Sequence, residues 1–228
     1  MTDNALDAHD LHKDYGDGAA LDSLSVSIAT GERVALIGHN GSGKTTFLRL
    51  AAGLLDVTSG RVEIFGRAPH DVESRRRLSY LSDTPVFYDD LSVWEHLEYT
   101  SRLHGVADWV DRAAELLARL GLDDRADDLP TRFSRGLKQK AALALAVVRP
   151  FDLLMVDEPF VGLDATGKDV LLTLLDEASD RGAAVVVATH EASFLDRVSR
   201  VIALRNGELV HDGPPTDASV RSWLHSPS

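Results

Sequence analysis

Gly38 to Thr45, GHNGSGKT, is the stretch that decides the fold. It matches the phosphate-loop pattern G-x-x-x-x-G-K-[ST]. It lies between the apolar segment RVALIG, which predicts a strand, and GKTTFLRLAAGLL, whose spacing predicts a helix. Glycines allow successive backbone N–H groups to point into one concavity, and the helix adds the positive end of its dipole. The stretch therefore predicts a site for the phosphates of a nucleoside triphosphate.

Two side chains of this loop have specific chemistry. Lys44 supplies a compact positive charge for the β- and γ-phosphates, and the Thr45 hydroxyl is a suitable ligand for Mg²⁺. A nucleoside triphosphate and Mg²⁺ are therefore the expected cofactors. The loop residues expected to contact the nucleotide are Gly38, His39, Asn40, Gly41, Ser42, Gly43, Lys44, Thr45 and Thr46.

A second acidic motif, Asp157 and Glu158, follows the apolar run LLMV. An acid at the end of a buried strand lies at the carboxyl edge of the sheet, where open α/β folds bind ligands. Asp157 is expected to hold Mg²⁺, through water, and Glu158 to polarise an attacking water. The alternative is that these acids only end a strand in solvent.

The rest of the chain alternates strands and helices, which predicts an α/β fold with a mostly parallel, covered sheet. A helical block at about 84–149 interrupts this alternation and is expected to be inserted in a core of about 1–83 and 150–228, within one domain. Further strands are expected at 21–31, 61–66, 152–159 and 183–190, helices at 92–120, 134–148 and 169–179, and a hairpin at 198–213 around Asn206-Gly207.

Composition excludes several classes of protein. The formal charge of −12, from 36 acidic and 24 basic residues, argues against nucleic-acid binding, and no cysteine is present for disulfides or Cys-ligated zinc. The N-terminal sequence has no signal-peptide pattern. The longest apolar runs, 141–148 and 183–188, are far below the roughly 18 residues that span a bilayer. A membrane role would therefore require a partner.

Several motifs, in order over nearly the whole chain, resemble those of the ABC ATPases. FSRGLKQK resembles the signature L-S-G-G-Q and lies 157 − 134 = 23 residues before Asp157. VGLD ends at Asp164 like the loop after the second acid, and ATHE places His190 like the switch histidine. KDYGDGAAL places Tyr15 where the family has a ring that stacks on adenine. Taken alone, each would be an ordinary structural residue; their joint occurrence is more specific.

The resemblance implies a phosphate-loop ATPase core with an antiparallel β subdomain near the N-terminus. It also implies a head-to-tail dimer, homomeric or heteromeric, that holds two ATP molecules. Ser134 and Gly136 would contact the ATP of the opposite subunit through the start of a helix, and Ser134, Arg135, Gly136 and Asp164 would lie at the dimer interface. Glu158, His190 and Lys44 would carry ATP hydrolysis.

Two positions depart from the family pattern. Arg135 replaces the first signature glycine, as in ATPases of exporter-type systems, and we expect it to be helical because a bulky side chain is strained at positive φ. Asp83 stands where the family has a glutamine that contacts Mg²⁺ and the attacking water. Asp83 can still meet Mg²⁺ but cannot donate a hydrogen bond, and the alternative is a solvated loop residue.

An aromatic loop follows Asp83. Phe87, Tyr88 and Trp94 lie where the membrane subunit of an ABC transporter inserts a short cytoplasmic helix, and one or two of these rings are expected to pack internally. The resemblance therefore implies an ATPase that drives transport, in the export direction by its signature, from the cytoplasmic face of the membrane. The alternatives are an ABC-type ATPase of an assembly machine, such as iron–sulfur cluster assembly, and an inactive ATP binder.

Overall fold

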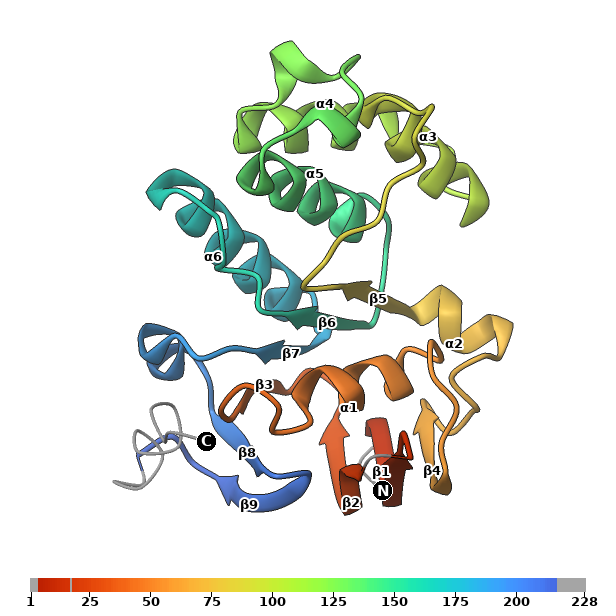
Figure 1. The fold of residues 1–228 in the computed structure, drawn as a ribbon. Coiled ribbons are helices and arrows are strands. Elements are labelled where there is room, and N and C mark those ends of the chain that lie inside the picture. Colours follow the sequence, from red (N-terminus) through yellow and green to blue (C-terminus); the bar gives the residue numbers. More distant parts are fainter. Residues whose placement is uncertain (1–3, 17, 217–228) are drawn as a thin grey trace.

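The computed structural model describes residues 4–16 and 18–216, which form two sheets and two groups of helices (Figure 1). The strands are β1 (Asn4–Asp14), β2 (Ala19–Ala29), β3 (Arg33–Ile37), β4 (Ser59–Ile64), β5 (Leu78–Leu81), β6 (Leu153–Asp157), β7 (Ala184–Ala188), β8 (Arg200–Arg205) and β9 (Glu208–Gly213). The helices are α1 (Lys44–Ala51), α2 (Val72–Arg77), α3 (Val93–Leu103), α4 (Val110–Leu120), α5 (Arg135–Val147) and α6 (Ala165–Asp180), with short 3₁₀ turns η1 (Asp123–Arg125), η2 (Pro130–Arg132) and η3 (Ala192–Arg197).

The central sheet has the strand order β5-β6-β7-β3-β8-β9. All neighbours pair in parallel except β8 and β9, which form the expected antiparallel hairpin at Asn206-Gly207. Its strands are apolar on both faces because each face is covered. Ala35 and Ile37 of β3 pack with the helical side, whereas Val34 and Leu36 pack with α1 and the antiparallel sheet. The expected α/β class is confirmed.

The second sheet, β2-β1-β4, is antiparallel and lies on the opposite side of α1 from the central sheet (Figure 1). Phe47 and Leu48 of α1 are fully buried between the two sheets. β1 is irregular: its register shifts several times, and Asp10 has a φ of 46°. The antiparallel subdomain that the family resemblance implies is therefore present and packs against the phosphate-loop helix.

The helical block packs α3, α4 and α5 together above the β5 edge of the sheet (Figure 1). The expectation of continuous helical structure over 92–120 is wrong, because α3 and α4 are separated by His104–Trp109. The chain turns at Gly105, where φ is 72°. α3 begins with a full capping box, in which Ser92 and Glu95 bond each other's backbone N–H groups. The block thus has two short helices that fold back on each other before α5.

Candidate nucleotide site

The phosphate loop lies between β3 and α1 and is held by the β8–β9 turn. Gly207 N–H donates to Ser42 O at 3.1 Å. A side chain on Gly43 would collide with Ala20 O and Leu21 at 2.7 Å, so the loop needs glycine where it meets β2. In the described structure no side chain caps the first turn of α1, and its first N–H groups are therefore available to an anion.

Lys44 is buried at the base of this loop. Its ammonium donates to Gly38 O at 2.8 Å and His39 O at 3.3 Å, and lies 3.7 Å from Glu158 Oε1. A buried ammonium is costly unless oxygens surround it. These carbonyls hold the charge beside the cavity, where a phosphate oxygen is a stronger partner.

Asp157 ends β6 and has no exposed surface. Within residues 4–16 and 18–216, neither of its carboxylate oxygens accepts a hydrogen bond of normal geometry. The pKa of Asp157 is raised to about 6, mainly by burial and also by the charges of Asp83 and Glu158, while the Thr45 hydroxyl and Lys44 oppose the shift. An unpartnered buried carboxylate beside a threonine hydroxyl fits Mg²⁺, which needs few protein ligands when phosphates and water supply the others.

No group of three His, Cys, Asp or Glu side chains in the described part of the chain forms a metal cluster. A complete metal cage of protein ligands is therefore absent there. This agrees with a cation that arrives with the nucleotide, because such ions take one or two carboxylates from the protein.

Glu158 and His190 are brought together from the ends of neighbouring strands. Asp157 of β6 pairs with Ala188 of β7, so the residues that follow each strand meet. His190 Nδ1 lies 2.8 Å from Glu158 Oε2, and Nδ1 is the donor because a carboxylate only accepts. Glu158 has a φ of 46°, in the left-handed region that residues other than glycine seldom adopt. Glu158 is thus fixed between Lys44 and His190, as a base that orients water requires.

Asp83 lines a cavity of about 320 Å³ together with Lys44, Thr45 and Glu158. Its Oδ1 accepts from Ser82 at 3.1 Å and from Arg49 at 3.3 Å. The side chain is 36% exposed. Asp83 therefore borders the phosphate cavity, and its expected contact with Mg²⁺ stays a prediction, as does the alternative of a solvated loop residue.

Ser134, Arg135 and Gly136 begin α5. Ser134 is the N-cap and accepts from Leu137 N–H at 3.4 Å, and Arg135 is the first helical residue, which confirms its expected helical conformation. A Cβ on Gly136 would lie 2.5 Å from Gly162 O. The second signature glycine is thus required by contact with the loop after Glu158 in the same chain.

Asp164 caps α6. Its side chain accepts from Gly167 N–H at 2.8 Å and from Lys140 at 3.1 Å, and these contacts lower its pKa. Gln139 of α5 also donates to Pro159 O at 3.5 Å. α5 and the 158–164 loop are therefore joined at several points, and the expected interface role of Asp164 stays a prediction.

Tyr15 follows β1 and is 57% exposed, with the Lys13 ammonium 5.1 Å from its ring centroid. It does not line the phosphate cavity. The start of β2 nevertheless lies close to the phosphate loop, because a Cβ on Gly43 would meet Ala20 O at 2.7 Å. The ring of Tyr15 is exposed, and its expected contact with adenine stays a prediction.

The three aromatic residues after Asp83 differ in exposure. Trp94 packs against Trp109 with ring centroids 5.1 Å apart, and Phe87 packs partly on the helical core. Tyr88 is 55% exposed, and its backbone N–H donates to His96 Nε2 at 2.9 Å. Two of the rings thus pack internally, and Tyr88 offers surface.

Sequence reasoning missed four polar residues of the site and its supports: Arg49, Ser82, Lys140 and His96. Arg49 follows Thr45 by one helical turn, and that spacing is a signal that could have placed it on the same face of α1. His96 lies four residues after the N-cap Ser92, to whose carbonyl its Nδ1 donates at 2.7 Å. Ser82 bonds its direct neighbour Asp83, and Lys140 depends on a contact with the distant Asp164.

None of the helices in the described residues is long and apolar enough to cross a bilayer. Comparison with known proteins adds the family. The sequence pattern of the ABC transporter family matches residues 21–161. The SkfA peptide export ATP-binding protein SkfE of Bacillus subtilis (strain 168) is 36% identical over 91% of this chain and 88% of its own length.

Two further similar proteins support the same family. The macrolide export ATP-binding/permease protein MacB of Hyphomonas neptunium (strain ATCC 15444) is 33% identical over 93% of this chain and 35% of its own length. A solved ATP binding subunit of an ABC transporter has a TM-score of 0.87 and 30% identity, over 98% of this chain and 95% of that chain. The chain therefore belongs to the ABC transporter family, in which it is an ATP-binding and ATP-hydrolysing subunit.

Proposed function

We propose that the chain binds ATP with Mg²⁺ and hydrolyses it to drive export through a separate membrane subunit. The observation that supports this most is the convergence of Lys44, Glu158 and His190 beside the buried, unpartnered Asp157. These are the parts that phosphoryl transfer to water requires: a phosphate cradle, a cation site and a residue that orients water.

Each residue has one task in this proposal. Bound Mg²⁺ would neutralise charge on the phosphates, and Thr45 and Asp157, with Asp83 at the rim, would hold it. The Lys44 ammonium binds the β- and γ-phosphates, and it gives up its hydrogen bonds to the loop carbonyls when it does so. Glu158 orients the attacking water and accepts its proton, and His190 fixes Glu158 and senses the γ-phosphate.

The signature half would complete the site from a second subunit. The N-terminal turn of α5 has N–H donors at Ser134–Gly136, and the dipole of the helix favours an anion there. In a head-to-tail dimer this turn and Asp164 would face the ATP held by the partner's phosphate loop. ATP would then bind the two subunits together, and hydrolysis would release them.

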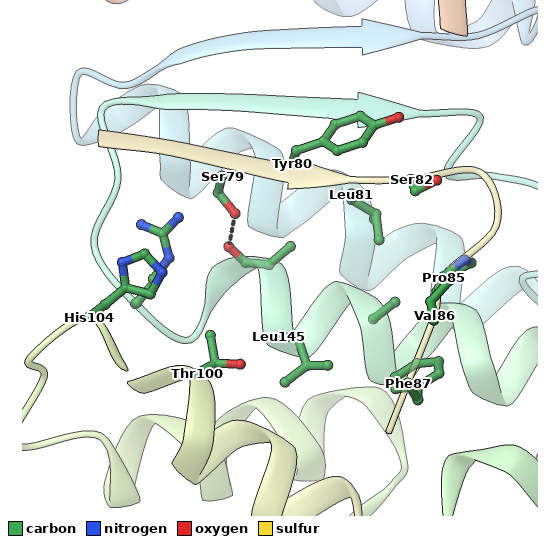
Figure 2. Close-up of a pocket in the computed structure, with 13 residues that line it drawn as sticks. Ser79, Tyr80, Leu81, Ser82, Pro85, Val86, Phe87, Thr100, His104 and Leu145 are labelled. Atoms are coloured by element: carbon green, nitrogen blue, oxygen red, sulfur yellow. Dashed lines mark hydrogen bonds between the residues drawn. The ribbon is translucent and has the colours of Figure 1, made fainter. Parts of the chain in front are cut away.

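A cavity of about 290 Å³ next to Phe87 is the proposed seat of the membrane subunit's helix (Figure 2). Pro85, Val86 and Phe87 border it on one side, and Thr100 and His104 of the α3 end border it on the other (Figure 2). Val86 is 91% exposed and Tyr88 is 55% exposed, which suits a protein contact. This contact would place the chain on the cytoplasmic face of the membrane.

Export is the direction that the relatives favour. SkfE is named for peptide export, and MacB for macrolide export, with the ATP-binding and permease functions in one protein. In the present case we propose that the permease is a separate chain. An assembly ATPase is not favoured by these relatives.

The test has two parts. The purified chain should hydrolyse ATP only with a divalent cation, and it should co-purify with a membrane protein from native membranes in mild detergent. The double variant Phe87→Ala/Tyr88→Ala should lose that protein and keep its basal ATPase activity. Leu209→Ala/Val210→Ala, on the partly exposed β9, is the matched control and should retain it. If the aromatic variant still co-purifies with the membrane protein, the cavity next to Phe87 is not the contact site. If the purified chain has no ATPase activity, the proposed enzymatic function is wrong.

A further inference from the structure

Arg49 and Asp83 form an ion pair at the edge of the phosphate cavity. Arg49 Nη2 lies 3.3 Å from Asp83 Oδ1, and the Ser82 hydroxyl donates to the same oxygen at 3.1 Å. Arg49 belongs to α1 and lies one turn after Thr45, whereas Asp83 lies in the segment after β5. The pair therefore joins the phosphate-loop helix to the segment that continues to Phe87 and Tyr88.

The Asp83 carboxylate adjoins the place that suits a divalent cation. It borders the same cavity as Thr45 and Glu158, and its charge acts on the buried Asp157. A carboxylate attracts a divalent cation more strongly than a neutral amide does. Arg49 and a bound cation thus compete for one carboxylate.

The ion pair is exposed enough to exchange. Arg49 is 40% exposed and Asp83 is 36% exposed, and pairs of this kind contribute little net stability. A divalent cation held also by Thr45, Asp157 and phosphate can therefore displace the guanidinium without a large loss elsewhere. Tyr80, which precedes this segment on β5, is partly buried against the core, and β5 is the strand from which Asp83 extends.

We propose that Arg49 is a positioning residue that holds the Asp83 carboxylate back from the cation site until a nucleotide-bound divalent cation displaces it. This inference rests on the proposed nucleotide and Mg²⁺ site. The exchange breaks the ion pair that joins α1 to the segment before residues 84–88. Cation binding would therefore affect the position of the aromatic loop through the Asp83 side chain.

The experiment measures Mn²⁺ binding by electron paramagnetic resonance, on the full chain with saturating ADP. The variants are Arg49→Gln, Arg49→Lys, Asp83→Gln and the double variant Arg49→Gln/Asp83→Gln. Arg49→Gln should lower the dissociation constant of Mn²⁺. The fold-change should be about three times as large in the wild-type background as in the Asp83→Gln background. Arg49→Lys keeps the charge and a donor and should stay near the wild-type value.

Two outcomes separate the possible failures. Equal tightening by Arg49→Gln in the wild-type and Asp83→Gln backgrounds would show a general effect of charge and would overturn the role of the pair. If the wild-type chain with nucleotide binds no Mn²⁺, the proposed cation site fails and this inference fails with it. Thermal unfolding of each variant establishes that the compared proteins are folded.

Discussion

The phosphate-loop half and the signature half of the nucleotide site are held in different ways. In the first, Glu158 contacts both Lys44 and His190 at the carboxyl edge of the sheet. In the second, the Ser134 and Asp164 side chains each cap a helix of their own chain. The side chains of the first half thus bond one another within one subunit. The second is a helix end that packs against the 158–164 loop, and Glu158, the proposed base, begins that loop.

The largest expected effect tests the chemistry of the first half. Glu158→Gln keeps the shape of the side chain and removes its capacity to take a proton. We expect ATP turnover to fall by about 10²–10⁴-fold while ATP binding persists and ATP-dependent dimers accumulate. Steady-state ATPase assays measure turnover, and size-exclusion chromatography with ATP measures the dimers, which form only if ATP binds.

Glu191→Gln is the matched control for this change. Glu191 is the acid that follows His190. Its carboxylate pairs with Lys168 at 2.8 Å and does not line the phosphate cavity. Its turnover should stay within about threefold of the wild-type value, as for a surface substitution. Equal turnover of Glu158→Gln and the wild type would remove Glu158 from the mechanism.

The second prediction concerns the cost of the buried acid in the first half. Asp157 keeps its proton to a higher pH in the folded state, because its pKa is raised to about 6 from an ordinary 3.8. Ionisation of Asp157 therefore destabilises the free protein, with a cost that grows as pH rises through this window and is constant above it. Asp157→Asn removes the cost, which is about 2–3 kcal/mol at neutral pH.

Urea unfolding without nucleotide measures this effect. The gain in the free energy of unfolding from Asp157→Asn should increase by about 1 kcal/mol between about pH 5 and about pH 8. The same variant should bind Mn²⁺ with ADP more weakly than the wild type. A gain that is equal at both pH values would show that the pKa of Asp157 is not raised.

The third prediction tests whether the second half depends on its contact with the loop. Gly136→Ala places a methyl group 2.5 Å from Gly162 O, so α5 and the loop must separate. We expect a loss of about 1–3 kcal/mol in the free energy of unfolding and a fall in ATPase activity of about tenfold or more. ATP binding to the phosphate loop of the same subunit should remain.

Gly182→Ala separates a collision from a general glycine effect. An added Cβ there meets no atom within 4 Å, although φ is 85°. It should cost about 1 kcal/mol of stability through its backbone conformation and leave turnover unchanged. If Gly136→Ala has no more effect on turnover than this control, the loop contact does not position the signature helix.

The parts of the fold that could be predicted are those with local patterns. The phosphate loop, the acid at the end of β6 and the Asn206-Gly207 turn all follow from short stretches. β1 carries many polar residues and shifts register, so no clean alternation marks it. α2 has six residues, which are too few for a helical period, and β5 has four. The Arg49–Asp83 pair joins distant segments and needs the structure.

The smallest expected effect concerns Arg135, the departure of the signature from the family pattern. The side-chain stem of Arg135 lies beside Gly162, and its backbone is helical. Position 135 itself therefore does not require glycine. Arg135→Gly should cost about 0.5–1 kcal/mol in the free energy of unfolding, because glycine weakens the first turn of α5. ATPase activity should stay within about twofold of the wild-type value, since the N–H donors remain. A tenfold change in activity, with the helix intact by circular dichroism, would show that the guanidinium itself acts on the partner's nucleotide. The two halves would then both use charged side chains, and the contrast between them would be smaller than the structure indicates.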